Sequence, residues 1–131
     1  MRFLIADDNQ MNQNLMHIIF KPYGTCDIVS NGLEVMEKYL DSIKTNSPYD
    51  LICLDILMPT MDGHKTLHKI RMIENEKNIK YEDRTLIMMV TGIDNDIDRV
   101  RSICSEADAI MVKPVTVKSV REKLIELQLI D

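Results

Sequence analysis

No apolar run in this sequence is long enough to cross a membrane as a helix, and few cysteines are present. The 3 cysteines, Cys26, Cys53 and Cys104, are odd in number and widely spaced, which argues against a disulfide framework or a zinc site and predicts buried, reduced thiols. Basic residues are not in excess either. With 16 Lys and Arg against 21 Asp and Glu, the net charge is −5, which disfavours a nucleic-acid-binding surface.

Signals for export and for a second domain are also missing. The segment MRFLIADD has one positive charge and a brief apolar run before two aspartates, which is too short for a signal peptide. Neither a Gly/Ser-rich linker nor an internal repeat interrupts the 131 residues. We therefore expect a cytoplasmic protein with one domain over residues 1–131 and no contact with membrane or nucleic acid.

Short apolar runs alternate along the chain with segments that have helical signals. Strands covered by helices on both faces form continuous apolar stretches, and LICL and TLIMMV have this character. The predicted strands are 2–6, 25–29, 50–54, 85–90 and 108–112, and the predicted helices are 10–22, 32–44, 63–75, 95–106 and 117–127. This order is (βα)5, which predicts an α/β, doubly wound parallel five-stranded sheet of the flavodoxin-like type.

The composition of the runs also predicts the order of the strands. The second run, CDIV, contains a charge and suits an edge of the sheet, whereas the most apolar runs belong in the middle. The order 2-1-3-4-5 satisfies this requirement. We expect Asn31 to cap the helix at 32–44, and the charged stretch from Glu74 to Arg84 to form a solvated connection.

Polar residues directly follow four of the apolar runs. Asp7 and Asp8 follow the first run, Asp55 the third, Thr91 the fourth and Lys113 the fifth. Because crossovers between parallel strands are right-handed, the carboxyl ends of the strands share one edge, where open α/β sheets bind ligands. An Asp after a strand is often only a helix cap or a turn residue. The combination, rather than any one member, therefore predicts a site.

Three clustered carboxylates require a positive partner. Two like charges ~4 Å apart cost on the order of 4 kcal/mol at an effective dielectric near 20, so either their pKa values rise or a cation binds. Oxygen ligands of this kind suit Mg²⁺ beside a phosphate. With Lys113 as a second cation and Thr91 as a hydroxyl donor, Asp55 is placed as a nucleophile for phosphoryl transfer.

The pattern resembles the receiver domain of two-component response regulators over the whole chain. The resemblance is carried by Asp7-Asp8, the segment DILMPTMDG from Asp55 to Gly63, Thr91-Gly92 and Lys113-Pro114. The run DDNQMN is also similar to receivers attached to hybrid histidine kinases, whereas the start at Met1 favours a free-standing protein. No DNA-binding helices follow, so this chain is not expected to be a transcription factor by itself.

The resemblance implies a phosphorylation site and a metal site. Asp55 would accept a phosphoryl group from the phosphohistidine of a sensor histidine kinase or of a histidine phosphotransfer protein. Mg²⁺ would be held by Asp8, by Asp55 and by the backbone carbonyl of Leu57, and Asp7 would reach the metal through water. The chain would be no enzyme beyond its own phosphorylation and slow dephosphorylation.

The resemblance also implies a conformational response. Lys113 would pair with the phosphoryl oxygens, Thr91 would move toward them as the switch, and the Lys113-Pro114 peptide bond would be cis. The changed conformation would signal to an output protein that the sequence does not name. The domain would remain a monomer or form a phosphorylation-dependent dimer through its fourth helix, fifth strand and fifth helix.

Three positions bear on how this chain would differ within that family. Ile110 stands where an aromatic residue is usual, so two interpretations are open: coupling to the output face is altered, or Ile110 simply packs and the loop after the fourth strand carries the signal. Leu57 and Ile93 flank the expected phosphoryl group, and neither orients an attacking water. We therefore predict slow self-dephosphorylation.

Two other functions are compatible with the motifs. The first is a Mg²⁺-dependent phosphohydrolase working through an aspartyl phosphate, although such enzymes usually place a second acid where this chain has Leu57. The second is an interaction module that is never phosphorylated, which the complete set of polar residues opposes. His64 and His68 have a metal-binding spacing but no third ligand, so we expect a solvated helix face. Met11, beside the acidic residues, is expected to be exposed for partner docking.

Overall fold

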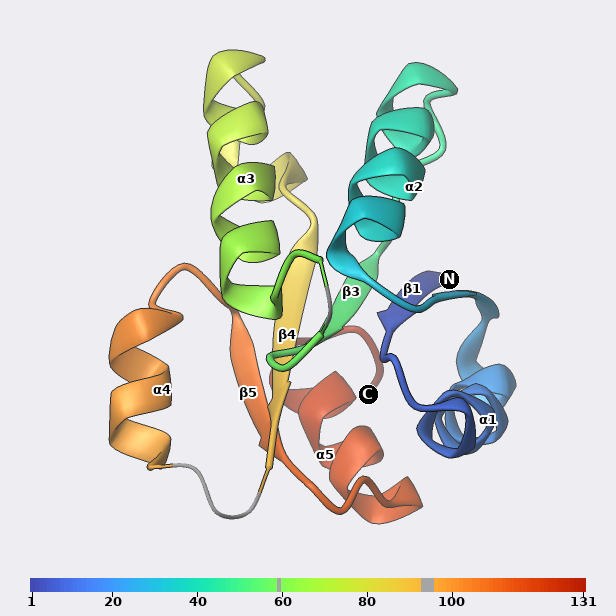
Figure 1. Cartoon of the computed structure of the whole chain (residues 1–131). Helices are drawn as coiled ribbons and strands as arrows, with labels where there is room; N and C mark the ends of the chain where they lie inside the picture. The colour runs from blue at the N-terminus through green and yellow to red at the C-terminus, as the bar shows by residue number, and fades with distance from the viewer. Residues whose placement is uncertain (59, 93–95) are drawn as a thin grey trace.

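A computed structural model of the chain describes residues 1–58, 60–92 and 96–131 (Figure 1). Among the residues singled out above, Ile93 and Pro59 of the segment DILMPTMDG lie outside these ranges. No helix of the described ranges combines the length and the apolar character needed to cross a membrane.

Five parallel strands form one sheet in the order β2-β1-β3-β4-β5, which confirms the predicted order and the α/β, doubly wound class. The strands are β1 Arg2–Ala6, β2 Thr25–Val29, β3 Leu51–Asp55, β4 Leu86–Thr91 and β5 Ala109–Val112. The charged run CDIV lies at the edge in β2, where most of its side chains stay partly exposed, whereas every residue of the central β3 is buried. The contrast follows from the number of covered faces and neighbours that each strand has.

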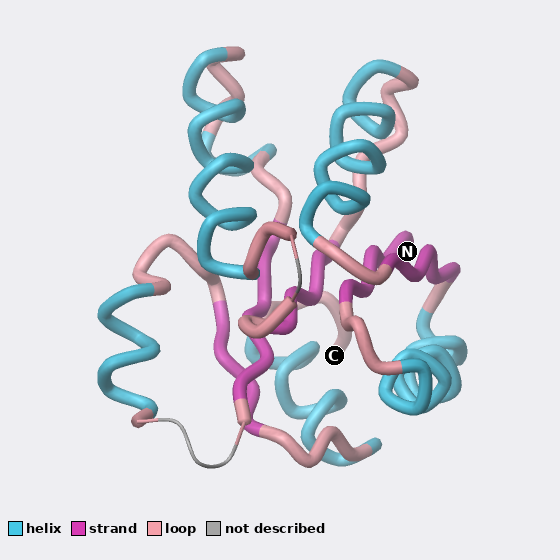
Figure 2. The backbone as a smooth tube through the Cα atoms, in the orientation of Figure 1, coloured by secondary structure: helices cyan, strands magenta, loops and turns pink. Residues whose placement is uncertain are grey.

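Helices follow the strands in the predicted alternation (Figure 2). Their bounds are α1 Gln10–Phe20, α2 Gly32–Lys44, α3 Gly63–Glu76, α4 Ile97–Ile103 and α5 Val117–Glu126, with 3-10 turns at Lys21–Tyr23 and Tyr81–Asp83. The predicted N-cap of α2 is confirmed, because the Asn31 side chain accepts a hydrogen bond from the backbone N–H of Glu34 at 2.9 Å.

The helices cover both faces of the sheet. The helices α2, α3 and α4 pack on one face and α1 and α5 on the other (Figure 1). Alternate residues of each strand point to opposite faces, so Leu4 and Ala6 of β1 belong to the first core while Phe3 and Ile5 belong to the second. All three thiols are free, and the predicted burial holds for Cys53 and Cys104, whereas Cys26 is half-buried.

Two local predictions are wrong at their boundaries. The stretch from Glu74 to Arg84 is not solvated throughout, because Glu74 belongs to α3 and is fully buried beside the Arg71 guanidinium at 2.7 Å. The helix predicted over 95–106 is shorter, since α4 ends at Ile103, and the N–H of Ala107 then donates to the carbonyl of Cys104 in a turn. Both segments also bond to distant parts of the chain, Glu74 to the Thr85 N–H and the Glu106 carbonyl to Arg71, and local sequence patterns do not contain such contacts.

Candidate functional site

The carboxyl ends of the central strands bring the predicted residues to one edge of the sheet. Asp55 is the last residue of β3 and pairs in register with Val90, and Asp7 directly follows β1, where Ala6 pairs with Leu54. Because side chains alternate along a strand, Asp7 and Asp55 share the face on which α1 and α5 pack. The sheet register therefore places these two carboxylates side by side.

Three carboxylates form one cluster at this edge. Oxygen atoms of Asp7, Asp8 and Asp55 all lie within 4.8 Å of one another. Asp7 and Asp55 are 5% and 6% exposed, whereas Asp8 is open to solvent. Like charges at such separations in a partly buried place repel one another strongly, so the cluster requires nearby positive charge.

Lys113 supplies part of that charge. Its Nζ lies 2.9 Å from Asp55 Oδ2 and 3.7 Å from Asp7 Oδ2. Burial raises the pKa of the Asp55 carboxyl, and the hydrogen bond from Lys113 offsets this only in part. Burial by itself lowers the pKa of Lys113. The hydrogen bonds and negative charges of Asp55 and Asp7 raise this pKa by more than burial lowers it, so the ammonium stays protonated. One cation facing three carboxylates leaves the cluster net negative.

The second oxygen of Asp55 is held by the backbone that follows β3. The N–H of Leu57 donates to Asp55 Oδ1 at 3.1 Å, which turns the Leu57 peptide toward the cluster, while the Leu57 side chain is 73% exposed. Gly63 starts α3 directly against β3, and a Cβ at this position would lie 2.4 Å from the Asp55 carbonyl oxygen. Only glycine permits this approach, which sets the start of α3 against the end of β3 beside the carboxylates.

A hollow opens to solvent above the acidic cluster. Its volume is ≈ 310 Å³, and its lining includes the three aspartates, Lys113 and Leu57. Gly92, directly after β4, lines another wall. The hollow is therefore large enough for a phosphoryl group and a hydrated ion beside Asp55.

Thr91 lies at the same edge as the last residue of β4, where it is 1% exposed. Its carbonyl accepts a hydrogen bond from the N–H of Lys113 at 2.8 Å, so the end of β4 is tied directly to the residue that pairs with Asp55. The Lys113-Pro114 peptide bond is cis, as expected. Ile110 is partly buried against the core formed with α4.

Residues in and just before the first turn of α1, for which the motifs indicated no role at the site, complete it. The Asn12 side chain lines the hollow beside the aspartates. Gln13 Nε2 donates to the Asp7 carbonyl at 2.6 Å and to Ser30 Oγ at 3.0 Å, which holds the loop after β1 in place. Asn9 caps α1 and its N–H donates to Asp7 Oδ1 at 2.9 Å. The sequence signal for this first turn was Asn9, a favoured N-cap residue, whose side chain accepts a hydrogen bond from the backbone N–H of Asn12.

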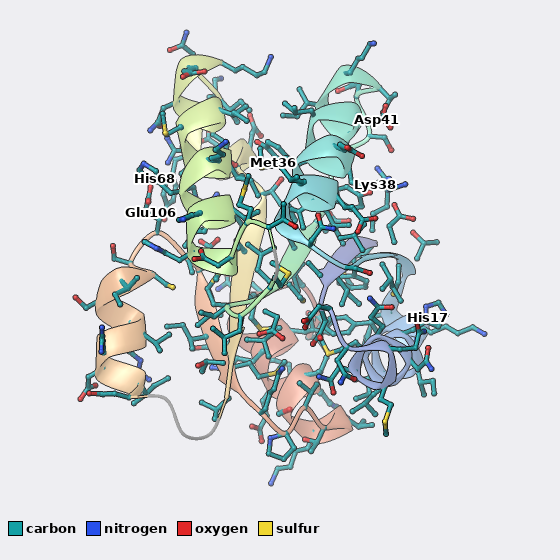
Figure 3. All side chains as sticks on the ribbon, in the orientation of Figure 1. His17, Met36, Lys38, Asp41, His68 and Glu106 are labelled. Carbon is teal, nitrogen blue, oxygen red and sulfur yellow. The ribbon has the colours of Figure 1, made fainter. Side chains whose placement is uncertain are left out.

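The histidines of α3 match the expected solvated helix face only in part, because His64 is partly buried. His68 is exposed on α3 and pairs with Glu106 at 3.0 Å (Figure 3), and His17 is exposed on α1. His64 forms no metal-type cluster with other His, Cys, Asp or Glu side chains of the described ranges. Met11 of α1 is 79% exposed, which confirms the expected exposure of this side chain.

Comparison with known families decides what this arrangement is. The model of the response regulator receiver domain matches residues 3–125. The chain belongs to the response regulator receiver domain family. As a receiver domain, it has the acidic cluster, the lysine and the threonine at the carboxyl edge of the sheet, where the order of the predicted strands placed them.

Curated relatives contain this receiver domain within longer proteins. It is 31% identical over 111 residues to a CpxR homolog, a transcriptional regulatory protein of Haemophilus influenzae, covering 85% of this chain and 42% of that protein. It is 32% identical over 124 residues to hybrid signal transduction histidine kinase G of Dictyostelium discoideum, covering 92% of this chain and 3% of that protein. The chain thus spans less than half the length of these relatives.

Solved receiver structures have the same fold. Response regulator TrrA of Thermotoga maritima, solved in complex with Mg²⁺ and a beryllium fluoride, matches with a TM-score of 0.74 at 25% identity. The match covers 96% of this chain and 97% of that one. The receiver fold described above is therefore shared over nearly the whole length of both chains.

Proposed function

We propose that this receiver domain accepts a phosphoryl group onto Asp55 from the phosphohistidine of a sensor histidine kinase or a histidine phosphotransfer protein. The observation that carries the proposal is the way Asp55 is held. One carboxylate oxygen accepts from Lys113 and the other from the Leu57 N–H, so the carboxylate is oriented toward an open hollow with a cation beside it. Positioning and charge neutralisation are the main requirements of phosphoryl transfer.

The donor set fits Mg²⁺. All three acidic side chains present hard oxygen ligands within 4.8 Å of one another, and Lys113 alone among the described cationic side chains pairs with them. We propose that Asp8, Asp55 and the Leu57 carbonyl hold the ion, with Asp7 reaching it through water. When bound, Mg²⁺ supplies neutralisation of charge on the phosphoryl oxygens. TrrA, a relative of the same fold, was solved with Mg²⁺ and a beryllium fluoride, which supports the assignment.

Lys113 and Thr91, near Asp55, have different proposed roles. Lys113 Nζ is placed to follow the charge from the Asp55 carboxylate onto a transferred phosphoryl group, because it already contacts Asp55 Oδ2. Thr91, at the end of the neighbouring strand, is the residue proposed to sense the new group. Its backbone bond to Lys113 would pass a movement of either residue to the other. The output protein that reads this change is a partner still to be identified.

The proposed cellular location and the proposed extent of catalysis follow from the receiver function. Residues 1–131 would act as one receiver unit, whether alone or within a longer protein, and its three free thiols fit the reducing cytoplasm. The chain would catalyse only its own phosphorylation and slow dephosphorylation. Turnover of a phosphate ester added as substrate would contradict this assignment and favour the phosphohydrolase alternative.

Intact mass measurement after incubation with Mg²⁺ and acetyl phosphate tests the proposal. We expect a gain of one phosphoryl group, lost when a chelator removes the metal and lost in Asp55→Asn. Asp41→Asn is the matched control, since Asp41 is an exposed aspartate on α2, away from the carboxyl edge of the sheet (Figure 3). A gain that persists in Asp55→Asn, or its absence from the wild type with both acetyl phosphate and a phosphorylated partner, would reject the proposal.

A further inference from the structure

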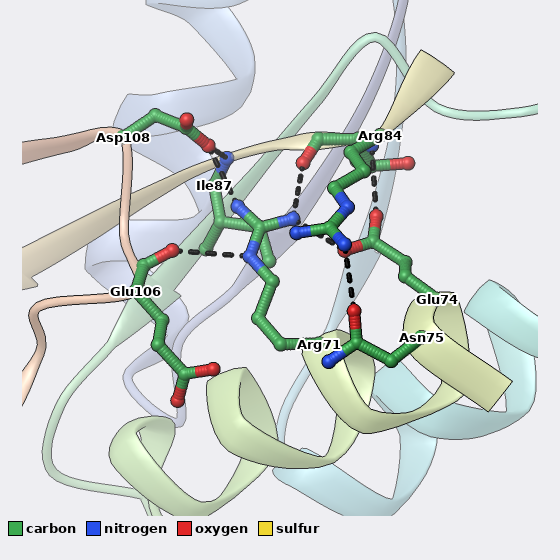
Figure 4. A network of polar contacts seen from close by, with 8 residues as sticks. Arg71, Glu74, Asn75, Arg84, Ile87, Glu106 and Asp108 are labelled. Carbon is green, nitrogen blue, oxygen red and sulfur yellow. Dashed lines mark hydrogen bonds and ion pairs between the residues drawn. The ribbon is translucent and has the colours of Figure 1, made fainter. Parts of the chain in front are cut away.

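A buried arginine joins three segments of the chain at the edge of the sheet opposite the aspartates. Arg71 of α3 is 6% exposed, and its Nη1 donates to Glu74 Oε1 at 2.7 Å and to the Thr85 carbonyl at 2.9 Å. Its Nε donates to the Glu106 carbonyl at 3.0 Å, and its Nη2 to Asp108 Oδ2 at 2.7 Å (Figure 4). We call Arg71, Glu74, Glu106 and Asp108 the Arg71 clamp.

The acceptors of the clamp are themselves held by the start of the fourth strand. Glu74 Oε2 accepts from the N–H of Thr85 at 3.0 Å. Asp108 Oδ2 accepts from the N–H of Ile87 at 2.8 Å, and the Asp108 N–H donates to the Ile87 carbonyl at 2.8 Å (Figure 4). Because Glu74, Glu106 and Asp108 each make a further hydrogen bond besides the one to Arg71, the positions of the clamp side chains are fixed relative to one another.

The loop that follows α4 is consequently held from two sides. Besides the clamp, His68 of α3 pairs with the Glu106 side chain at 3.0 Å, on the surface of the same loop (Figure 3). The loop, residues 105–108, is thus bonded to α3 through both a backbone carbonyl and side chains, and to β4 through Asp108.

The helix α4 itself has few attachments. Of its residues Ile97–Ile103 only Val100 is buried, and the buried Cys104 caps its carboxyl end. No α4 side chain takes part in the ion pairs between described residues. By contrast, α3 buries six residues. The carboxyl end of α4 is therefore anchored through the loop after it, while its amino end lies nearer along the chain to Thr91.

We propose that the Arg71 clamp is a fixed pivot for α4, which confines the response to phosphorylation to the amino-terminal part of this helix. The inference rests on the proposed function of Asp55. A displacement at Thr91 reaches α4 at its amino end, because Ile97, the first residue of the helix, is only six residues further along the chain. Because the loop after its carboxyl end is bonded to α3 and β4, a short helix can rotate about that end but cannot translate as a whole.

The test removes the clamp without leaving a buried charge. In the double variant Arg71→Met/Glu74→Gln, the amide of the new side chain can accept from the Thr85 N–H and donate to the Thr85 carbonyl, so both groups stay satisfied. Arg84→Met is the matched control. Arg84 donates to Asn75 at 2.6 Å and lies over the Tyr81 ring, near the clamp but bonded to none of its members.

Hydrogen exchange measured by mass spectrometry reads the outcome in phosphorylated and unphosphorylated protein. In the wild type and in Arg84→Met, phosphorylation should change exchange rates in 97–103 by about tenfold or more and those in 105–108 by less than about twofold. In the double variant the change should extend into 105–108. Intact mass is measured on the same samples, so the phosphorylated fraction is known for each protein.

The outcomes separate this inference from the proposed function. A normal gain in mass with equal exchange changes in both segments of the wild type would overturn the pivot alone. So would a double variant that is phosphorylated and keeps the wild-type exchange pattern. Failure of the wild type to gain a phosphoryl group by any donor would overturn the function of Asp55, and the pivot with it.

Discussion

The two edges of the sheet use buried charge in opposite ways. At the carboxyl edge, the carboxylates of Asp7, Asp8 and Asp55 face Lys113 as their one cationic partner among the described residues. At the amino edge, the Arg71 guanidinium makes four hydrogen bonds to carboxylates and carbonyls. The first cluster is short of positive charge and needs a ligand to complete it. The second is complete, and its stability depends only on the chain.

The largest effect is expected from breaking the complete cluster. Arg71→Met leaves the fully buried Glu74 without its cation, and breaking a buried ion pair in this way costs about 3–5 kcal/mol of unfolding free energy. Urea denaturation of the wild type, Arg71→Met and Arg71→Met/Glu74→Gln measures it. The double variant should recover a large part of the loss. Equal stability of Arg71→Met and the wild type would show that the clamp is not a buried charge network.

Completing the other cluster should have the next largest effect. If Mg²⁺ binds the carboxyl edge, it should raise the unfolding free energy by about 2.7 kcal/mol at a free concentration 100 times its Kd. Asp8→Asn should weaken this response. Without metal the same variant should be more stable than the wild type by about 1 kcal/mol, because it relieves repulsion near solvent between carboxylates whose oxygens lie within 4.8 Å of one another.

Controls for the metal effect come from both edges. Asp41→Asn removes an exposed aspartate from α2, and it should keep the full stabilisation by Mg²⁺. Arg71→Met/Glu74→Gln should also keep it, since the clamp lies at the opposite edge of the sheet. Loss of the metal response in either control, or its persistence in Asp8→Asn, would contradict a binding site built from the three carboxylates. Thermal or urea unfolding at several Mg²⁺ concentrations measures each case.

The lifetime of the phosphorylated state tests the carboxyl edge in a different way. Neither Leu57 nor Ile93, which lies outside the described residues, offers a polar group to position water. Replacing Leu57 with Asn and Ile93 with Glu should speed phosphate loss by about tenfold, equivalent to about 1.4 kcal/mol of barrier. The decay of the mass gain after removal of acetyl phosphate measures it. An unchanged half-life would show that these side chains do not control attack by water.

The carboxyl edge was predictable from the sequence and the amino edge was not. The polar residues of the carboxyl edge come at the ends of apolar runs in the sequence, so strand order alone brings Asp7, Asp55 and Lys113 together. Arg71 and Glu74 instead look like ordinary polar positions of an amphipathic helix. Their burial depends on partners more than ten residues away, such as Asp108, which helical periodicity does not contain.

The ends of elements were predicted less well for the same reason. The helix expected over 95–106 is α4, which ends at Ile103, ahead of the loop that Arg71 holds. Strand β3 includes Asp55, and β4 includes Thr91, because backbone pairing with the neighbouring strand extends to these residues. Pairing partners and tertiary hydrogen bonds, rather than local propensity, set these limits.

The smallest effect should come from the exposed part of the amino edge. His68 and Glu106 are paired at 3.0 Å, but their side chains are 59% and 42% exposed, so water already solvates both groups. Exposed pairs contribute little, and His68→Ala should change the unfolding free energy by less than about 0.5 kcal/mol. Urea denaturation of His68→Ala and of Arg71→Met, measured in parallel, compares the two interactions that hold the loop at 105–108. A loss close to that of Arg71→Met would mean that pairing, and not burial, makes this edge stable.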